Sequence, residues 1–415
     1  MNNVKVGIEK IRVYPCSMAL DMKELCKERN HPWEDLRDVM LIDERAVCPP
    51  WEDPVTIAVN AAAPMLTEQD KQDIELIIVC SESGVDQEKP MSTWVHRHCG
   101  IQPRCRNFEA KHACYSGTGA MHLAASWLVS GIAGPKAKAL VVTSDLSRKH
   151  FHKPYEFVMG GGATAMLISR DPRFFEIELG KSAIYTNEVS DLTRPTLIVE
   201  QGNSETSLLS YIDAVESTVS GYIEKVSQMT GERVTYDYFK KNIYHMPFGG
   251  MTVRASRAAL RQFGSYKKAE ADAIWEQKTK KSLTYSRRMG GTYAGSTFIG
   301  MLGMIDNSED IRPGDRFGVF SYGSGCCAEF YSGLVGYDAK AVAREAGLRE
   351  LQDSRYKCSV REYEEADRER TLYTEVGDFQ PATNGYNDLY KKRYEGSGLL
   401  VYKGMHDYYR QYARA

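Results

Sequence analysis

The 415-residue sequence lacks features that define several classes of protein. It has no apolar run near the roughly 20 residues that a membrane-spanning helix needs, and its N-terminus lacks the apolar core of a signal peptide. Neither charge dominates, since 53 lysines and arginines stand against 55 aspartates and glutamates, for a net charge of −2. This balance provides no basic field to hold nucleic acid or an anionic membrane. We therefore expect a cytoplasmic protein that binds neither.

Clustered cysteines are also missing. The ten cysteines are scattered, with no CxxC pair and no Cys/His ligand spacing. The histidines at 96 and 98 have no acidic partners at metal-ligand spacing. We expect reduced thiols and no metal site. No low-complexity linker interrupts the chain, so we expect one compact body.

What is present indicates an α/β fold. Residues 73–80 (DIELIIVC) and 137–144 (AKALVVTS) have the composition of buried parallel strands. Between them, residues 115–129 are rich in Gly, Ala and Ser and almost uncharged, which predicts a helix buried on all sides. Strands that alternate with helices are typical of a parallel or mixed sheet.

Two glycine-rich runs suggest an internal duplication. Residues 159–171 (MGGGATAMLISRD) and 322–335 (YGSGCCAEFYSGLV) each turn into a strand-like segment. Two unrelated hairpins are the alternative. We predict an N-terminal half over 1–175 and a C-terminal half over 176–415. The second half is expected to hold helices over 207–229 and 250–263 and a highly charged, Tyr-rich surface excursion at about 353–387.

The most informative segment is FEAKHACYSGTG, residues 108–119. Cys114 lies where an extended run turns into a helix of small residues. Helix dipoles and free N–H groups favour a thiolate, so we expect a nucleophile that is ionised at neutral pH. The alternative is a buried structural thiol.

Three further positions are candidates for chemistry. Glu82 follows a strongly apolar strand, where a desolvated carboxylate makes a competent general base; a turn or cap residue is the alternative. His245 ends a strand-like run beside two glycines, although a lone His is more often structural. The turn YGSGCC, with Ser324 and Gly325, offers backbone N–H groups to an oxyanion but lacks the Lys-Ser/Thr of a phosphate loop. We interpret the adjacent thiols of residues 326 and 327 as packing groups.

Together these segments resemble 3-hydroxy-3-methylglutaryl-CoA synthases, a branch of the thiolase superfamily. The resemblance covers about residues 4–340. It includes Glu-Ser-Gly at 82–84, Ala-Cys-Tyr at 113–115, His-Met-Pro-Phe at 245–248 and Gly-Ser-Gly at 323–325. It implies a duplicated thiolase-like fold with layered helices and mixed five-stranded sheets, a homodimer, and no cofactor.

The same resemblance implies roles for the site residues. Cys114 takes an acetyl group from a thioester donor, and Glu82 removes a proton from the acetyl methyl. His245 steadies the acceptor's ketone oxygen and helps to protonate it. The backbone at Cys114 and around Ser324 forms the oxyanion hole. The remaining residues implied to line the site are Gly325, Ser296, Tyr115 and Gly84.

One subgroup is most similar, the synthases of polyketide β-branching. They are condensing acyltransferases that use acetyl and β-ketoacyl groups on the phosphopantetheine of acyl carrier proteins. Primary-metabolism enzymes tend to place lysine soon after Pro-Phe, whereas Gly249 and Gly250 occupy that stretch here. Beyond it, Arg254, Arg257 and Arg261 follow at helical spacing. This face is expected to dock an acidic carrier protein, with a solvated helix face as the alternative.

Three other functions remain open. A primary 3-hydroxy-3-methylglutaryl-CoA synthase would use acetyl-CoA and acetoacetyl-CoA. A chain-elongating ketosynthase typically pairs Cys and His with a second His or Asn, whereas this chain has Glu82. A non-catalytic thiolase-like partner protein would not need Cys114, Glu82 and His245 together.

One departure from the family is Gly291, near a position that usually carries Asn.

Overall fold

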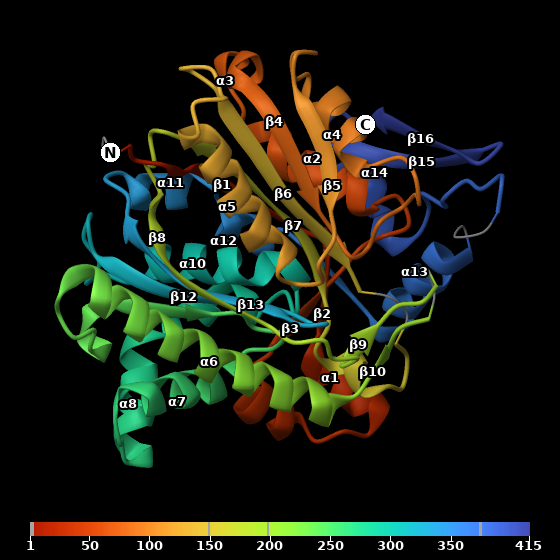
Figure 1. Cartoon of the computed structure of the whole chain (residues 1–415). Helices are drawn as coiled ribbons and strands as arrows, with labels where there is room; N and C mark the ends of the chain where they lie inside the picture. Colours follow the sequence, from red (N-terminus) through yellow and green to blue (C-terminus); the bar gives the residue numbers. More distant parts are fainter. Residues whose placement is uncertain (1–3, 148–149, 197–198, 373–375) are drawn as a thin grey trace.

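Figure 1 shows the computed structural model, in which helices pack around one large twisted sheet. The structure describes residues 4–147, 150–196, 199–372 and 376–415. The sheet has nine strands in the order β11-β12-β13-β8-β1-β7-β6-β4-β5. In chain order its strands are β1 (Gly7–Pro15), β4 (Ile74–Cys80), β5 (Arg106–Ala110), β6 (Lys138–Leu146), β7 (Gly161–Ser169), β8 (Phe175–Thr186), β11 (Lys241–Tyr244), β12 (Arg316–Gly323) and β13 (Cys327–Val335).

Smaller sheets and the helices complete the fold. The remaining strands are β2 (Met18–Asp21), β3 (Glu44–Val47), β9 (Leu192–Thr193), β10 (Gln201–Gly202), β14 (Tyr356–Cys358), β15 (Leu400–His406) and β16 (Tyr409–Arg414). The helices are α1 (Met22–Arg29), α2 (Pro54–Ala62), α3 (Glu68–Asp73), α4 (Met91–Cys99), α5 (Ser116–Val129), α6 (Ser204–Thr230), α7 (Met251–Phe263), α8 (Lys268–Lys278), α9 (Leu283–Ser286), α10 (Ser296–Asn307), α11 (Ala339–Glu345), α12 (Leu348–Asp353), α13 (Val360–Leu372) and α14 (Leu389–Arg393). Among the described helices, none combines the length and apolar composition that crossing a bilayer requires.

Two similarly built halves share the large sheet. In the first, β1 pairs with β7, β7 with β6, and β6 with β4. In the second, β8, β13, β12 and β11 repeat this order with the same parallel and antiparallel senses. The halves meet where β1 pairs with β8 over two residue pairs only. The two glycine-rich runs become β7 and β13, which hold corresponding places, so the duplication is visible in the sheet.

The two halves differ in strand number. The first half has the expected five strands, because β5 extends its edge beside β4. The second half has four, and the expectation of a second five-stranded sheet is therefore wrong in detail. Residues 264–295 lie where an edge strand is missing and form α8 and α9 instead. Their Lys-, Ala- and Glu-rich composition favours helix. The predicted boundary between 175 and 176 falls at the start of β8 and stays a prediction.

The predicted helices and strands form close to their expected bounds, but one burial prediction is wrong. Helix α5 is not buried on all sides, since Leu123 is 58% exposed. Figure 1 shows α5 lying across the front of the sheet, with its outer face uncovered. Burial extends along most of its counterpart α10, whose residues from Ser296 to Ile305 are all buried. Helices α9 and α11 pack against α10.

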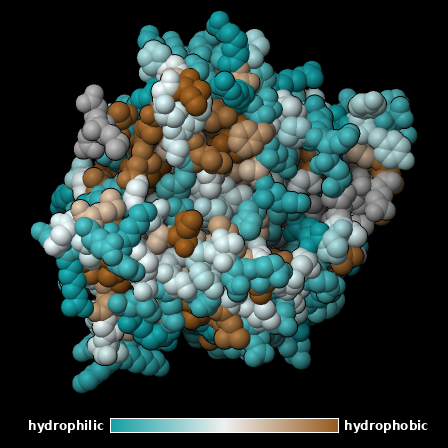
Figure 2. Space-filling view, in the orientation of Figure 1, coloured by the Kyte–Doolittle hydropathy of each residue, from teal (hydrophilic) through white to brown (hydrophobic). Residues whose placement is uncertain are grey.

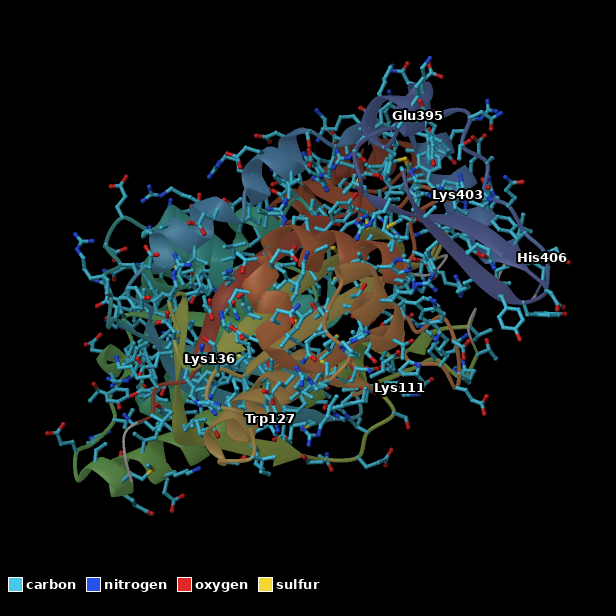
Figure 3. All side chains as sticks on the ribbon, turned by 90° about the horizontal axis from the view of Figure 1, so that it is seen from above. Lys111, Trp127, Lys136, Glu395, Lys403 and His406 are labelled. Carbon is cyan, nitrogen blue, oxygen red and sulfur yellow. The ribbon has the colours of Figure 1, made fainter. Side chains whose placement is uncertain are left out.

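The charged segment at 353–387 is only partly a surface excursion. Within its described part, α13 buries Tyr363 and Ala366 against α1. Arg29 on α1 lies between two carboxylates, 2.9 Å from Glu156 and 2.5 Å from Glu364. A tyrosine ring and an ion-pair network therefore replace the missing aliphatic residues. Figure 3 shows the β15–β16 hairpin, which carries Lys403 and His406, projecting from the side away from Trp127.

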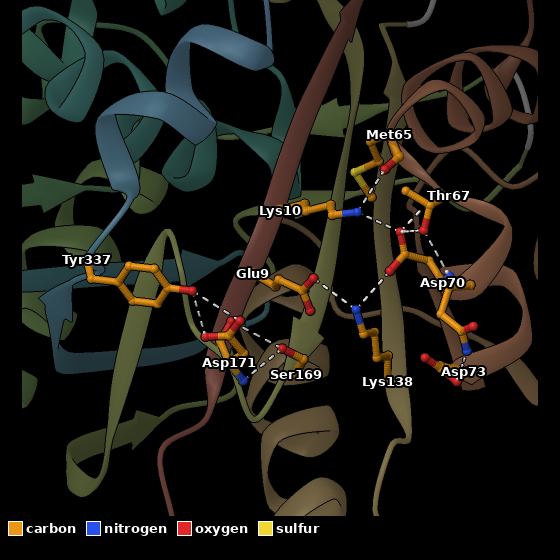
Figure 4. Close-up of polar contacts among 11 residues, drawn as sticks. Glu9, Lys10, Met65, Thr67, Asp70, Asp73, Lys138, Ser169, Asp171 and Tyr337 are labelled. Carbon is orange, nitrogen blue, oxygen red and sulfur yellow. Dashed lines mark hydrogen bonds and ion pairs between the residues drawn. The ribbon is translucent and has the colours of Figure 1, made fainter.

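A second ion network joins α3 to the sheet (Figure 4). The Asp70 carboxylate accepts from Lys10 on β1 at 2.6 Å and from Lys138 on β6 at 2.8 Å. Lys138 also contacts Glu9 at 2.9 Å. The network holds β1, β6 and α3 together at the amino end of β6.

Candidate active site

The site forms where strand ends meet short turns. Glu82 follows the end of β4, Cys114 follows the end of the adjacent parallel strand β5, and His245 follows the end of β11. Carboxyl ends of neighbouring parallel strands lie at the same edge of a sheet. The result is direct contact in the first half, where Cys114 Sγ lies 3.4 Å from Glu82 Oε1.

Cys114 is held in a tight turn before α5. Ala113 has a φ of 40°, in the left-handed region, and the N–H of Tyr115 donates to the carbonyl of His112 at 3.1 Å. Tyr115 is the residue that caps α5. Its phenol donates to the Glu329 carboxylate at 2.8 Å. The turn therefore places the Cys114 thiol against Glu82, and the hydrogen bond to Glu329 anchors the residue that follows the cysteine.

The expectation of a thiolate at neutral pH is wrong for the substrate-free protein. Burial raises the pKa of Cys114 well above its usual range, and the Glu82 carboxylate raises it further. Desolvation and a nearby negative charge both oppose ionisation, and here they outweigh the start of α5. The protein holds a protonated thiol beside a carboxyl group that accepts its proton when that carboxyl group is ionised.

Glu82 has the environment of a general base. Burial raises its pKa to about 8, the Asp145 carboxylate adds to this, and Arg194 opposes it. Asp145, at the end of β6, accepts the backbone N–H of Glu82 at 2.8 Å. Arg194 donates to the backbone oxygen of Glu82 and pairs with Glu200. A carboxylate with a raised pKa is a stronger base than an exposed one.

Asp145 and Arg194 were missed in the sequence. Asp145 carries the same signal as Glu82, a carboxylate at the carboxyl end of a buried strand, and this signal is sufficient to find it. Arg194 lies just after the two-residue strand β9, and no pattern in the sequence connects it to Glu82.

His245 is buried and fixed at three points. Its backbone N–H donates to Phe320 O at 2.8 Å, and its carbonyl accepts the Tyr211 phenol at 2.6 Å. The ring Nδ1 lies 2.7 Å from Ser296 Oγ, at the start of α10. Burial lowers the pKa of His245 to about 3, so the imidazole is neutral. A neutral imidazole still supplies an N–H donor.

The late Gly-Ser-Gly turn connects His245 to Cys114. Tyr322 lies 6.4 Å from the His245 ring, centroid to centroid. At Gly323 a Cβ atom would lie 2.6 Å from the backbone nitrogen of Tyr115, so only glycine allows this approach. Gly325 donates its N–H to Asp191 at 3.0 Å, so this N–H is not available to an oxyanion. Ser324 lies between the two glycines, and its role as an oxyanion donor stays a prediction.

Other predicted positions lie near the site with different surroundings. Gly84 lies beside Glu109, where a Cβ would be 3.2 Å from Oε1. At Gly291 a Cβ would lie 2.6 Å from Pro247 O, which leaves no space for the family's Asn side chain. Its amide instead donates to Val158 O at 2.7 Å. The structure therefore explains this departure by close backbone packing next to His245.

One group of potential metal ligands exists among the described residues, away from this site. Cys16 Sγ, Cys48 Sγ and a Glu52 oxygen lie within 4.8 Å of one another. The Glu52 carboxylate already accepts from the phenols of Tyr14 and Tyr394 at 2.8 and 2.7 Å. That arrangement satisfies the carboxylate without an ion. The absence of a functional metal stays a prediction.

Comparison with known proteins assigns the family. The profile described as Hydroxymethylglutaryl-coenzyme A synthase C terminal matches residues 257–413. The chain is 37% identical over 374 residues to "Polyketide biosynthesis 3-hydroxy-3-methylglutaryl-ACP synthase PksG" of Bacillus subtilis, covering 87% of each chain. It is 32% identical over 378 residues to "Hydroxymethylglutaryl-CoA synthase" of Enterococcus faecalis, covering 89% of this chain and 93% of that protein.

A solved structure agrees in fold over nearly the whole chain. The HMG synthase of the curacin biosynthetic pathway, in complex with its holo donor-ACP, superimposes with a TM-score of 0.93 at 36% identity. The match covers 99% of this chain and 100% of that one. The expected thiolase-like architecture and the resemblance drawn from the sequence are confirmed, and the chain belongs to the 3-hydroxy-3-methylglutaryl-CoA synthase family of condensing acyltransferases.

Proposed function

We propose that the chain adds an acetyl group, held on Cys114, to a β-ketoacyl thioester carried by an acyl carrier protein. Hydrolysis then releases a 3-hydroxy-3-methylglutaryl-type thioester, the β-branching step of polyketide biosynthesis. The observation that carries the chemistry is the 3.4 Å contact between the Cys114 thiol and the partly buried Glu82 carboxyl. The chain is 37% identical to a polyketide 3-hydroxy-3-methylglutaryl-ACP synthase and 32% identical to a Hydroxymethylglutaryl-CoA synthase. This difference supports an acyl carrier protein, rather than coenzyme A, as the carrier of the substrates.

The reaction begins with acetyl transfer. The Cys114 sulfur attacks the carbonyl carbon of the donor thioester while its proton passes to Glu82. The bond from that carbon to the carrier sulfur then breaks, and the departing carrier thiolate takes the proton from Glu82. The raised pKa of Cys114 makes this proton acceptor necessary, because little thiolate is present beforehand. Covalent attachment then holds the acetyl group beside the acceptor, which removes much of the entropy barrier.

Condensation uses the same base. Once ionised again, the Glu82 carboxylate takes a proton from the acetyl methyl, and the resulting carbon forms a bond to the acceptor's ketone carbon. The ketone π electrons move to oxygen, which His245 stabilises by hydrogen bonding and helps to protonate. One well-placed oxyanion donor is typically worth about 2.7–4 kcal/mol. Water then attacks the thioester carbonyl, and the Cys114 sulfur leaves.

The segment after His245 favours a carrier protein over coenzyme A. A Cβ at Gly249 would lie 2.5 Å from a Leu283 methyl, and a Cβ at Gly250 would lie 2.0 Å from Val39 O. Neither position therefore accommodates the lysine that would bind coenzyme A phosphates in primary-metabolism enzymes. The substrates are then carried on the phosphopantetheine of an acyl carrier protein, and the enzyme needs no cofactor of its own.

A primary-metabolism synthase that uses acetyl-CoA and acetoacetyl-CoA is the second candidate, favoured by the 32% identity to the Enterococcus faecalis enzyme. The separating experiment is mass spectrometry of the protein with acetyl-carrier protein and acetyl-CoA in parallel. We expect faster loading of Cys114 from the carrier protein. Faster loading from acetyl-CoA would assign the primary activity.

Substitutions test the roles of the two residues. Cys114→Ala abolishes loading if this sulfur is the nucleophile, and stoichiometric acetylation elsewhere would contradict that. Glu82→Gln retains the sulfur but lacks the base, so acetyl-enzyme accumulates without condensation. The condensation rate is expected to fall by on the order of 10²–10⁴. A variant that condenses at nearly the wild-type rate would place the base elsewhere.

The predicted docking face has an uneven charge distribution. On α7, Arg257 pairs with Asp272 at 2.6 Å and Arg261 pairs with Glu216 at 2.5 Å. Arg254 is exposed, and within the described residues no ion pair engages it. We therefore propose that Arg254 contributes most to docking an acidic carrier protein and that Arg257 and Arg261 contribute less.

We also propose that the enzyme is a cytoplasmic homodimer. Strand β5 is an edge of the nine-stranded sheet, and its Phe108 is 41% exposed. Figure 2 shows hydrophobic side chains on the upper part of the face that carries α5. On α5 itself, Leu123 is exposed. Light scattering of the wild type should give twice the chain mass, and Phe108→Glu with Leu123→Glu should give monomers. A wild-type monomer would contradict the proposal.

A further inference from the structure

The two ring nitrogens of His245 have different partners. Nδ1 lies 2.7 Å from Ser296 Oγ, and that oxygen also accepts the backbone N–H of Met246 at 3.4 Å. Throughout the described ranges, no hydrogen bond from a protein group reaches Nε2. His245 and Ser296 are each only 1% exposed, so water does not compete freely for these contacts. The distances alone leave the proton on either nitrogen.

Counting donors and acceptors selects one tautomer. If Nδ1 carried the proton, Ser296 would accept from both Nδ1 and Met246, and its own hydroxyl hydrogen would have no acceptor among the described residues. If Nε2 carries the proton, Ser296 donates to Nδ1 and accepts from Met246, and only the Nε2–H is left without a protein partner, available to a bound substrate. An unsatisfied buried hydroxyl costs about 1–3 kcal/mol. The second arrangement is therefore favoured.

We infer that Ser296 is a positioning residue that holds His245 as the Nε2–H tautomer and presents that N–H to the acceptor's ketone oxygen. The inference deepens the proposed function and rests on it for the identity of the acceptor. It differs from the role implied by the family resemblance, in which Ser296 only lines the site. Since burial keeps the imidazole neutral, only one nitrogen carries a proton, and the choice of nitrogen decides whether His245 donates or accepts.

Aromatic neighbours restrict the ring, so the tautomer also fixes a direction. The rings of Tyr211 and Tyr322 each lie 6.4 Å from the His245 ring, at interplanar angles of 39° and 32°. The Tyr211 phenol also holds the His245 carbonyl. A ring flip would exchange Nδ1 for a carbon beside Ser296 and lose the 2.7 Å contact. Ser296 therefore sets orientation and proton position together.

The direct test is nitrogen NMR of protein labelled with ¹⁵N in its nine histidines. His245→Gln identifies the His245 signals by their loss. We expect a pyrrole-type Nε2 and a pyridine-type Nδ1 in the wild type, and a mixture of tautomers in Ser296→Ala. A pyrrole-type Nδ1 in the wild type would overturn the inference, whatever reaction the enzyme catalyses.

Kinetics give the second test. Ser296→Ala should load acetyl on Cys114 at the wild-type rate but condense at least about 10-fold more slowly, while Ser296→Thr should retain most of the rate. Thr297→Val is the matched control. Thr297 is the next residue of α10 and is equally buried, and its hydroxyl has no hydrogen-bond partner among the described residues.

The outcomes separate the inference from the proposed function. Wild-type condensation by Ser296→Ala, or equal losses in Ser296→Ala and Thr297→Val, would overturn the role of Ser296. Failure of the wild type to load Cys114, or full condensation by His245→Ala, would instead overturn the proposed function. The tautomer measured by NMR would stand in that case.

Discussion

Asp145 accepts the backbone N–H of Glu82 at 2.8 Å, so a buried carboxylate binds the main chain of the residue proposed as the base. The two residues are 63 positions apart in sequence and come from the ends of neighbouring parallel strands, β6 and β4. Asp145 orients the turn that carries Glu82 and raises the pKa of Glu82 through its charge. This pairing leads to the first prediction.

Condensation should increase with pH through an apparent pKa of about 8, because Glu82 acts as a carboxylate and burial keeps it protonated below that value. Asp145→Asn removes a neighbouring negative charge, so the acid limb of the profile should move to lower pH. The variant still desolvates Glu82, so the midpoint of the acid limb should stay above the ordinary pKa of glutamate. The measurement is condensation kcat/KM from pH 5.5 to 9.5.

Asp171→Asn is the control for this profile, because Asp171 contacts Tyr337, far from Glu82. A profile that is flat between pH 6 and 9 would show that Glu82 does not titrate as the structure indicates. An unchanged limb in Asp145→Asn would remove Asp145 as a cause.

Alkylation should report the protonated thiol of Cys114. Iodoacetamide reacts with thiolates, so modification of the Cys114 peptide at pH 7 should be slower than that of a free cysteine and should accelerate with pH. Above pH 8.5, Glu82→Gln should increase the rate, because the variant lacks the negative charge that raises the pKa of the thiol. Rapid modification of wild-type Cys114 at pH 7 would instead indicate a thiolate.

Acid should destabilise the protein through Asp70. Burial raises the pKa of Asp70, but hydrogen bonds from Lys10 and Lys138 outweigh this and hold it well below its usual range. A depressed carboxyl pKa contributes stability above the unfolded value of about 3.9, and this is lost as pH falls further. Asp70→Asn should lower the free energy of unfolding at pH 7 by about 2–3 kcal/mol. This loss of stability is smaller than the loss expected on breaking a fully buried ion pair, because the side chains of Lys10 and Lys138 are both 19% exposed.

Chemical denaturation between pH 3 and 7 measures this effect (Figure 4). The variant should lose less stability than the wild type as pH falls. Asp73→Asn, on the same helix, removes only a hydrogen bond to Gln69 and should behave like the wild type. Equal effects of the two substitutions would assign the loss to helix α3 rather than to the ion network.

Local patterns were sufficient for the strands at 73–80 and 137–144, for the helices at 115–129, 207–229 and 250–263, and for the three central residues of the site. Cys114, Glu82 and His245 each follow a strand end, a signal that lies within a few positions of the residue itself. The state of Cys114 was not predictable, because a helix start is a local feature whereas burial and the Glu82 charge arise only after folding. The missing fifth strand of the second half depends on which segment reaches the sheet edge, which sequence composition does not determine.

Partners distant in sequence also explain why the docking prediction needed revision. Helical spacing correctly places Arg254, Arg257 and Arg261 on α7, but it does not show that Asp272 lies beside the second and Glu216 beside the third. Both acidic residues belong to other helices, α8 and α6. Two of the three charges are therefore partly neutralised within the protein.

The last prediction uses this asymmetry. Arg254→Glu alone should raise KM for carrier-bound substrates and slow association, with an effect that weakens at high ionic strength. Individual exposed charges are worth only about 0–1 kcal/mol, so a several-fold change is expected. Arg344→Glu on α11, far from α7 in Figure 1, is the charge-matched control. Turnover of a small acetyl thioester without a protein carrier should be unchanged in both variants. If Arg254→Glu and Arg344→Glu alter carrier-bound turnover equally, net charge is the cause, and the carrier protein docks elsewhere than on α7.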